Sequence, residues 1–263
     1  MYAFAYERPA ALADAMAKIS AGGQALAGGQ TLIASLKQRL AQPGSLVDLS
    51  GISELSGIKK EGNTLVIGAM TRHEFVADSA EVKSSIPGLA ALAGNIGDRQ
   101  VRAMGTMGGS VANNDPAACY PSAVLALGAT VQTNKRKIAA DDFFQGMYST
   151  ALEEGELITA IHFPLAKKSA YAKFRQPASR FALVGVFVAQ TDQGVRVAIT
   201  GAGNGVFRHA GLEAALSKSF TPEAVDGVSI DASELIGDLH ASAAYRAQLI
   251  KVQTQRAVQQ ANA

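Results

Sequence analysis

The sequence of 263 residues contains a single cysteine, Cys119. One thiol cannot form a disulfide within the chain, so the sequence excludes a secreted fold that depends on disulfide bonds. Iron–sulfur clusters and structural zinc sites need several thiolates, so any such centre must lie on a partner chain. Cys119 itself has two interpretations: a small buried apolar residue, or a reactive thiol near a bound cofactor.

The chain also lacks long runs of basic or of apolar residues. Its net charge is only +2, and the densest basic cluster, Lys135 to Lys137, falls in a predicted hairpin turn, so nothing indicates nucleic-acid binding. The longest strongly apolar run, Phe181 to Ala189, is far shorter than a membrane span. The N-terminus has neither the basic start nor the apolar stretch of a signal peptide. We therefore expect a cytoplasmic protein with no membrane span.

The hydrophobic pattern changes near residues 164–169. Before this point, short helical and strand-like segments alternate. After it come three segments with the pattern of antiparallel strands, Ala170 to Arg175, Ala182 to Ala189 and Val195 to Thr200, and then a helical tail. With 48% apolar and 17% charged residues the chain is globular. We predict an α+β protein with two domains, residues 1–166 and 167–263.

A first glycine turn lies between a predicted strand, Gln24 to Ala27, and a predicted helix that begins at Thr31. Glycines allow a ligand to approach the backbone closely, and successive N–H groups in such a turn form a concave anion site. The hydroxyl of Thr31 adds a donor. The spacing of Gly28 and Gly29 matches neither a P-loop nor a Rossmann fingerprint. Taken alone, the segment is explained equally well by a tight turn or by a phosphate site.

A second glycine turn is predicted from Gly105 to Ser110, within the least regular stretch of the chain, residues 94–117. Thr106 and Ser110 supply hydroxyl donors, and the polar segment Asn113 to Asp115 follows at once. A long polar loop of this kind needs an explanation other than packing. Two such turns together predict that the backbone holds the pyrophosphate of a dinucleotide from both sides.

No arrangement of side chains indicates a catalytic or metal site on this chain. The four histidines are scattered without metal-ligand spacing, and we interpret each as a surface or packing residue; they are His73, His162, His209 and His240. Paired carboxylates such as Asp141 and Asp142 fit solvated turns or helix caps. Redox chemistry would therefore belong to a bound cofactor, with the protein supplying binding and orientation.

These motifs resemble those of one family, the FAD-binding medium subunits of the molybdenum hydroxylases, which include carbon monoxide dehydrogenase and xanthine dehydrogenase. Ala27 to Leu32 resembles the first flavin motif of the family, and Ile96 to Ser110 the second, which Asn114 to Ala117 continues. Further matching segments are Glu156 to Ile158, Tyr171 to Arg175 and Gly201 to Arg208. The sequence departs from the family pattern at Cys119, where many members have aspartate.

The resemblance implies a two-lobed FAD-binding domain of the vanillyl-alcohol-oxidase (PCMH) type. A small C-terminal domain with a three-stranded antiparallel sheet and helices would follow it. The implied function is an FAD subunit that relays electrons from iron–sulfur clusters on a partner to an external acceptor. The implied partners are a large subunit with a molybdenum cofactor and a small subunit with two [2Fe–2S] clusters, joined as a dimer of heterotrimers. Two alternatives stay open: a stand-alone FAD-dependent oxidase or dehydrogenase, and an assembly module without flavin.

The motifs and the resemblance together define the residues expected to bind FAD. They are Ala27, Gly28, Gly29, Gln30, Thr31, Leu32, Ile96, Thr106, Met107, Gly108, Gly109, Ser110, Asn114, Asp115, Ile158 and Lys173. By the resemblance, Ile96 contacts the flavin region, while Ile158 and Lys173 lie near the adenine or the flavin. No residue of this chain is expected to be a catalytic acid, base or nucleophile.

Overall fold

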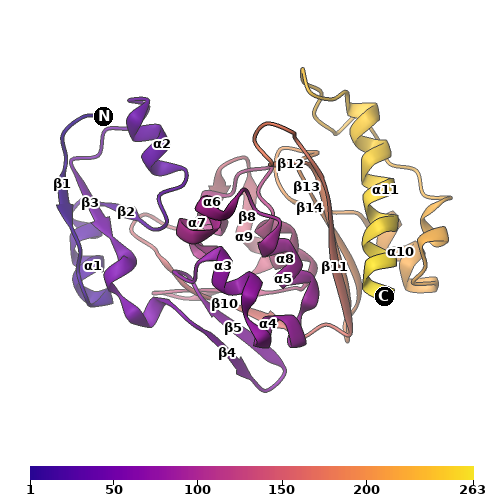
Figure 1. The fold of residues 1–263 in the computed structure, drawn as a ribbon, viewed down its shortest axis with the longest axis horizontal. Coiled ribbons are helices and arrows are strands. Elements are labelled where there is room, and N and C mark those ends of the chain that lie inside the picture. Colours follow the sequence, from indigo (N-terminus) through magenta and orange to yellow (C-terminus); the bar gives the residue numbers. More distant parts are fainter.

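The computed structural model describes residues 1–263, which form three main sheets in succession, each with its own helices (Figure 1). The first sheet has three parallel strands in the order β1 (Ala5–Glu7), β3 (Ser45–Asp48) and β2 (Gln24–Leu26). Two helices connect them, α1 (Leu12–Ser20) and α2 (Leu32–Lys37). This lobe has a small core of its own, and it presents the predicted strand, glycine turn and helix in the expected order.

The second sheet has five antiparallel strands and forms the base of the second lobe. Its order is β4 (Ile58–Glu61), β5 (Thr64–Gly68), β10 (Ile158–Pro164), β6 (Thr130–Thr133) and β7 (Lys137–Ala139). Turn residues predict two of its hairpins, one about Glu61 to Asn63 and one about Asn134, and both are confirmed as β4–β5 and β6–β7. β5 alternates fully buried and half-buried side chains, which is the pattern of a strand with one face in the core.

Six helices pack with this sheet around the largest core of the protein, a cluster of 31 buried residues. They are α3 (His73–Asp78), α4 (Ala80–Ser85), α5 (Pro87–Gly94), α7 (Met107–Asn113), α8 (Tyr120–Ala126) and α9 (Ala140–Phe143). A further helix, α6 (Arg99–Met104), lies against α3 and has no buried residue. A short hairpin, β8 (Phe144–Gly146) and β9 (Ser149–Thr150), and two 3₁₀ turns, Leu49–Gly51 and Ser53–Leu55, complete the elements before the third sheet.

Two of these helices correct the prediction that residues 94–117 are irregular. α6 begins after Asp98, whose carboxylate accepts a hydrogen bond from the backbone N–H of Val101. α7 begins after Thr106, whose hydroxyl oxygen accepts one from the N–H of Gly109. Both are side-chain caps that stabilise a first helical turn, and they make helices of segments whose composition resembles a loop.

The third sheet is antiparallel, in the order β11 (Lys168–Arg175), β12 (Ala182–Thr191), β13 (Gly194–Thr200) and β14 (Phe207–Arg208). The three predicted strands are confirmed, and the two-residue β14 extends the sheet. The tail that follows is not helical throughout. α10 (Ala210–Lys218) and α11 (Ala243–Asn262) are separated by a stretch without regular helix or strand except for one 3₁₀ turn.

Strand β12 has both of its faces in a hydrophobic core. Val184, Val186 and Val188 belong to the cluster beneath α11, whereas Phe187 and Ala189 belong to the core of the second lobe. This accounts for the unbroken apolar run of the sequence, because side chains of a strand alternate between two faces and here both are covered. The third sheet therefore forms a wall between the second lobe and the tail (Figure 1).

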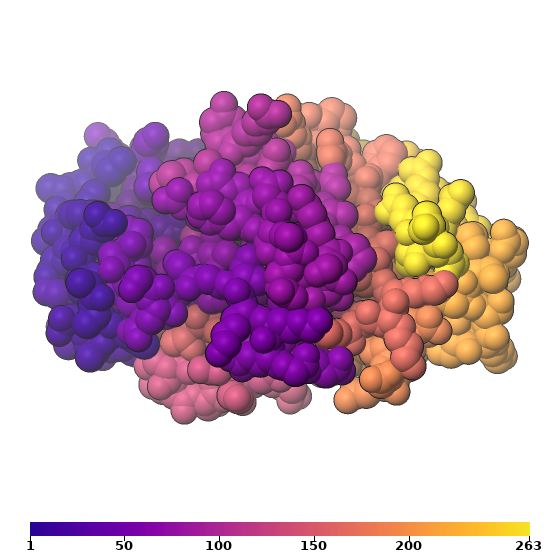
Figure 2. All heavy atoms as spheres, turned by 60° about the horizontal axis from the view of Figure 1, so that its bottom comes forward, coloured from indigo at the N-terminus to yellow at the C-terminus, as the bar shows by residue number.

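The long axis of the molecule runs from the first lobe to the tail. Figure 2 shows the N-terminal lobe at one end, the tail helices at the other and the second lobe between them. The longest helix, α11, has 20 residues but is polar on average, and no helix combines the length and the apolar character that a bilayer span requires.

Candidate functional site

The first glycine turn is an open backbone cradle. β2 ends at Leu26, α2 begins at Leu32, and Gly29 between them has a φ of +71°, a conformation that favours glycine. None of the backbone N–H groups from Ala27 to Thr31 donates to an acceptor within the chain. Successive free N–H groups in a turn form an anion site, so this segment is suited to phosphate oxygens.

The second motif differs from the predicted backbone turn. Gly108 and Gly109 lie in the first turn of α7, and the N–H groups of Met107 and Gly108 are already used. Met107 N donates to the carbonyl oxygen of Thr71 at 3.0 Å, and Gly108 N to that of Ala69 at 2.8 Å. The motif therefore supplies hydroxyl groups to the site, chiefly that of Ser110, rather than a second cradle of N–H groups.

Glycines bring the two motifs into contact. A Cβ atom on Gly28 would overlap the carbonyl oxygen of Met104 and lie 2.7 Å from Cα of Gly105. A Cβ on Gly109 would lie 3.2 Å from Cβ of Ala27. Only a residue without a side chain permits the backbone of the first turn to pack this closely against the segment that leads into α7.

A cavity of about 710 Å³ opens along this junction between the first and second lobes. It is large enough for a cofactor. Fourteen of the sixteen predicted residues line it: Ala27, Gly28, Gly29, Gln30, Thr31, Leu32, Ile96, Thr106, Gly108, Gly109, Ser110, Asp115, Ile158 and Lys173. Segments far apart in the sequence therefore meet at one place, as the two motifs together predict.

The other two predicted residues, Met107 and Asn114, do not line the cavity. Met107 is fully buried in the core of the second lobe. Asn114 is also fully buried, and its amide donates to the carbonyl oxygens of Gly146 at 2.8 Å and Ser149 at 2.7 Å. Asn114 thus fixes the β8–β9 hairpin, and its neighbour Asp115 faces the cavity instead.

His73 lines the cavity although the sequence gives no sign of a functional role. Its side chain is buried, it lies against Gly105, and its ring centroid is 5.2 Å from that of Tyr120. Burial, with the nearby Arg102 guanidinium as a smaller cause, lowers the pKa of His73 to about 4. The imidazole is therefore neutral at physiological pH, and its Nδ1 has no hydrogen-bond partner. Only the fold brings residue 73 beside residue 105, so spacing could not have indicated it.

Cys119 is a buried apolar residue, as the first of its two sequence interpretations has it. It is buried in the core of the second lobe, and it is also part of the cavity wall. Lys173, on β11, lies beside it with Nζ 3.4 Å from the sulfur, and the same ammonium donates to the carbonyl oxygen of Asn95 at 2.8 Å. The wall formed by Ile96, Cys119 and Lys173 thus joins the second lobe to the third sheet.

Glu156 fixes the start of β10 and with it the position of Ile158. Its carboxylate accepts two hydrogen bonds from the Arg136 guanidinium, both at 3.1 Å, and one from the hydroxyl of Thr133 at 2.6 Å. The hydrogen bonds from Arg136 are the largest cause that lowers the pKa of Glu156, to about 2. The charge of this cavity-lining residue is therefore already paired within the protein.

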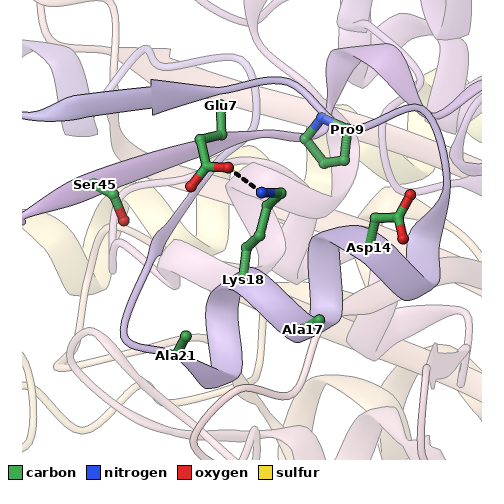
Figure 3. A pocket seen from close by; sticks show the side chains of 7 residues that line it. All are labelled: Glu7, Pro9, Asp14, Ala17, Lys18, Ala21 and Ser45. Carbon is green, nitrogen blue, oxygen red and sulfur yellow. Dashed lines mark hydrogen bonds and ion pairs between the residues drawn. The ribbon is translucent and has the colours of Figure 1, made fainter.

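A second hollow, of about 750 Å³, lies in the first lobe beside α1 (Figure 3). It is lined by Glu7, Pro9, Asp14, Ala17, Lys18, Ala21 and Ser45. Lys18 forms an ion pair with Glu7 across it, and none of the predicted cofactor residues faces it. The first cavity is therefore the candidate site.

Comparison with known proteins identifies the family. Residues 2–166 match the family described as "FAD binding domain in molybdopterin dehydrogenase". The carbon monoxide dehydrogenase medium chain of Hydrogenophaga pseudoflava is 34% identical, over 94% of each chain. The glyceraldehyde dehydrogenase medium chain of Sulfolobus acidocaldarius is 33% identical, over 97% of this chain and 96% of that one.

Solved structures give the same result for the whole fold. A chain of the reconstituted carbon monoxide dehydrogenase from Oligotropha carboxidovorans superimposes with a TM-score of 0.91 at 33% identity, covering 99% of this chain and 98% of that one. The agreement extends over both lobes and the tail. The chain therefore belongs to the family of FAD-binding subunits of the molybdopterin dehydrogenases, an oxidoreductase family whose flavin cofactor is FAD.

Proposed function

We propose that this chain is the electron-relaying subunit of a molybdenum hydroxylase complex. In this role, FAD in the cavity receives electrons from iron–sulfur clusters on a small partner and passes them to an external acceptor. The observation that carries the proposal is the cradle of free N–H groups from Ala27 to Thr31, which opens onto a cavity of about 710 Å³. Such a cradle suits the pyrophosphate of FAD.

Different residues of the chain would bind different parts of the cofactor. The N–H groups of Ala27 to Thr31 and the hydroxyl of Ser110 would donate to the pyrophosphate oxygens. Apolar side chains such as Ile96 and Ile158 would cover the less polar parts of the cofactor. FAD itself supplies the redox chemistry, and the protein contributes binding, orientation and electrostatics.

The single cysteine supports the assignment of the other redox centres to partners. Clusters of the [2Fe–2S] type need four ligands, mostly thiolates, and this chain has one thiol, which is buried. The similar chains of known complexes are named medium chains. We therefore propose a large molybdenum subunit and a small two-cluster subunit as partners, arranged as a dimer of heterotrimers.

Two measurements test the proposal. The purified chain, with FAD added, should show flavin absorbance that survives gel filtration, whereas its absence would favour an assembly module without flavin. Co-expression with the neighbouring genes, followed by pull-down on this chain, should recover a molybdenum subunit and a two-cluster subunit. A monomer that oxidises a substrate unaided would contradict the relay function and favour a stand-alone flavoenzyme.

A further inference from the structure

One wall of the cavity carries a cation without a carboxylate partner. The ammonium group of Lys173 is half-buried, donates to the carbonyl oxygen of Asn95 and lies 3.4 Å from the sulfur of Cys119. Lys173 takes part in none of the ion pairs of the chain. A half-buried charge that only dipoles satisfy is available to an anionic group in the cavity.

The other charged groups near this wall are cations, and the tyrosine and histidine side chains beside them are neutral. Arg175 donates to the amide oxygen of Asn95, and Arg180 lines the cavity. Burial raises the pKa of the Tyr171 phenol well above its ordinary value and has the same effect on Tyr120. His73 lines the cavity with a neutral imidazole whose Nδ1 is buried and has no partner. The positive charge of Lys173 is therefore not cancelled by a carboxylate or a phenolate on this side of the cavity.

The position of Cys119 explains why Lys173 stays unpaired. A thiol is a weak hydrogen-bond acceptor, so at 3.4 Å it occupies the space next to the ammonium without neutralising it. A carboxylate at the same place would form a direct ion pair with Lys173. Cys119 is only 6% exposed, and both it and Lys173 line the cavity, so the ammonium lies beside the space that a cofactor would fill.

We propose that Lys173, kept unpaired by Cys119, stabilises the negative charge that the flavin ring acquires on reduction, and thereby raises its midpoint potential. Two electrons from the iron–sulfur partner and one proton from water convert the neutral oxidised ring into a singly charged anion. An oriented cation at this wall favours the reduced form, because the oxidised ring has no net charge to attract. The inference rests on the proposed function in placing FAD in this cavity.

The position of the wall favours the ring rather than the phosphates. The free N–H groups that suit the pyrophosphate lie in the first lobe at Ala27 to Thr31. Lys173 stands instead on the third sheet beside Cys119, on a wall to which the apolar side chain of Ile96 also contributes and which can lie against a flat aromatic ring.

The test is a redox titration of the full-length chain loaded with FAD, against a reference dye. In Lys173→Met and in Cys119→Asp, the equilibrium constant for two-electron reduction should fall at least tenfold, a decrease of about 30 mV in midpoint potential. Two control variants should have midpoint potentials within about 30 mV of the wild-type value. Cys119→Ser keeps the position neutral. Lys168→Met removes a charge at the start of the same strand, β11, where the side chain is exposed, outside the cavity lining and bonded to Asn262 of the tail.

A second readout does not depend on the potential. Because Cys119 is the only cysteine, alkylation by iodoacetamide reports on one site. Bound FAD should slow the modification at least tenfold relative to the FAD-free chain. Equal rates would show that the cofactor does not cover this wall, and would overturn the proposal.

The outcomes separate the proposal from the function on which it rests. Unchanged potentials in both variants, in a chain that retains FAD, would overturn the charge effect and leave the relay function intact. Weaker retention of FAD by Lys173→Met, with an unchanged potential in Cys119→Asp, would assign the lysine to the phosphates and also overturn it. A wild-type chain that takes up no FAD would overturn both.

Discussion

The close contact at Gly28 gives a prediction about how the FAD cradle is built. In Gly28→Ala, the added methyl group would meet the carbonyl oxygen of Met104 and Cα of Gly105, and both are backbone atoms that cannot move aside as a flexible side chain would. Inserting a methyl group into a packed site costs about 1–3 kcal/mol. The chain can relieve this cost only by moving the first turn away from the segment that leads into α7.

The movement would open the cradle and weaken FAD binding. If the whole cost falls on the bound state, the Kd for FAD should rise about 5- to 150-fold, since each 1.4 kcal/mol is a factor of ten. If the contact persists instead, the FAD-free chain should unfold at a lower temperature, by about 2–4 °C for each kcal/mol. Quenching of flavin fluorescence measures the first effect, and thermal unfolding without FAD measures the second.

Gly44→Ala is the matched control. Gly44 lies in the same lobe, immediately before β3, and a Cβ there meets nothing within 4 Å. This variant should keep the wild-type Kd and Tm. If Gly28→Ala also keeps both, the two motifs are not in contact as the structure has them, and the explanation of Gly28 is wrong.

Three further variants test buried polar groups. Asn114→Ala removes two hydrogen bonds to the β8–β9 hairpin and should lower the free energy of unfolding in urea by about 1–3 kcal/mol, whereas Asn113→Ala, which loses none, should not. The lowered pKa of Glu156 stabilises the fold above pH 4.5, and at most about 3 kcal/mol of the unfolding free energy should be lost as pH falls from 4.5 toward 2. In Glu156→Gln, the unfolding free energy measured in urea should depend less on pH over this range. His73 has a pKa of about 4 in the folded chain against an ordinary value of 6.5, so the unfolded chain takes up its proton first as pH falls. The free energy of unfolding should therefore decrease between pH 6.5 and 4, by about 3 kcal/mol at most. An equally steep decrease of the unfolding free energy in His73→Phe would contradict the buried, neutral state of His73.

Local signals predicted much of the fold. Turn residues between alternating apolar segments located the β4–β5 and β6–β7 hairpins, and the three long strands of the third sheet appear where their apolar pattern indicates. The first glycine turn also appears as predicted, because strand, turn and helix are contiguous there. Sequence-local information was sufficient wherever the partners of a residue lie within a few positions along the chain.

The errors arose where partners are distant in the sequence. The glycines from 105 to 109 have the composition of a flexible turn. In the structure, however, a side chain at position 108 would overlap Ala69, and the N–H of Gly108 donates to the carbonyl oxygen of Ala69. The capping roles of Asp98 and Thr106 could have been read locally, since both precede a helix at the cap position. Nothing local distinguishes Asn114, which pins a hairpin more than thirty residues away, from Asp115, which faces the cavity.

Because β12 contributes to two cores at once, the protein should behave as one cooperative unit rather than as two that unfold independently. Detaching α11 would expose Val184, Val186 and Val188 to water, and the same strand carries Phe187 in the core behind the cofactor cavity. The strand beside it, β11, carries Lys173 into the cavity wall. Amide protons of the tail should therefore exchange with solvent more slowly when FAD is bound. Variants that destabilise α11 should likewise bind FAD more weakly.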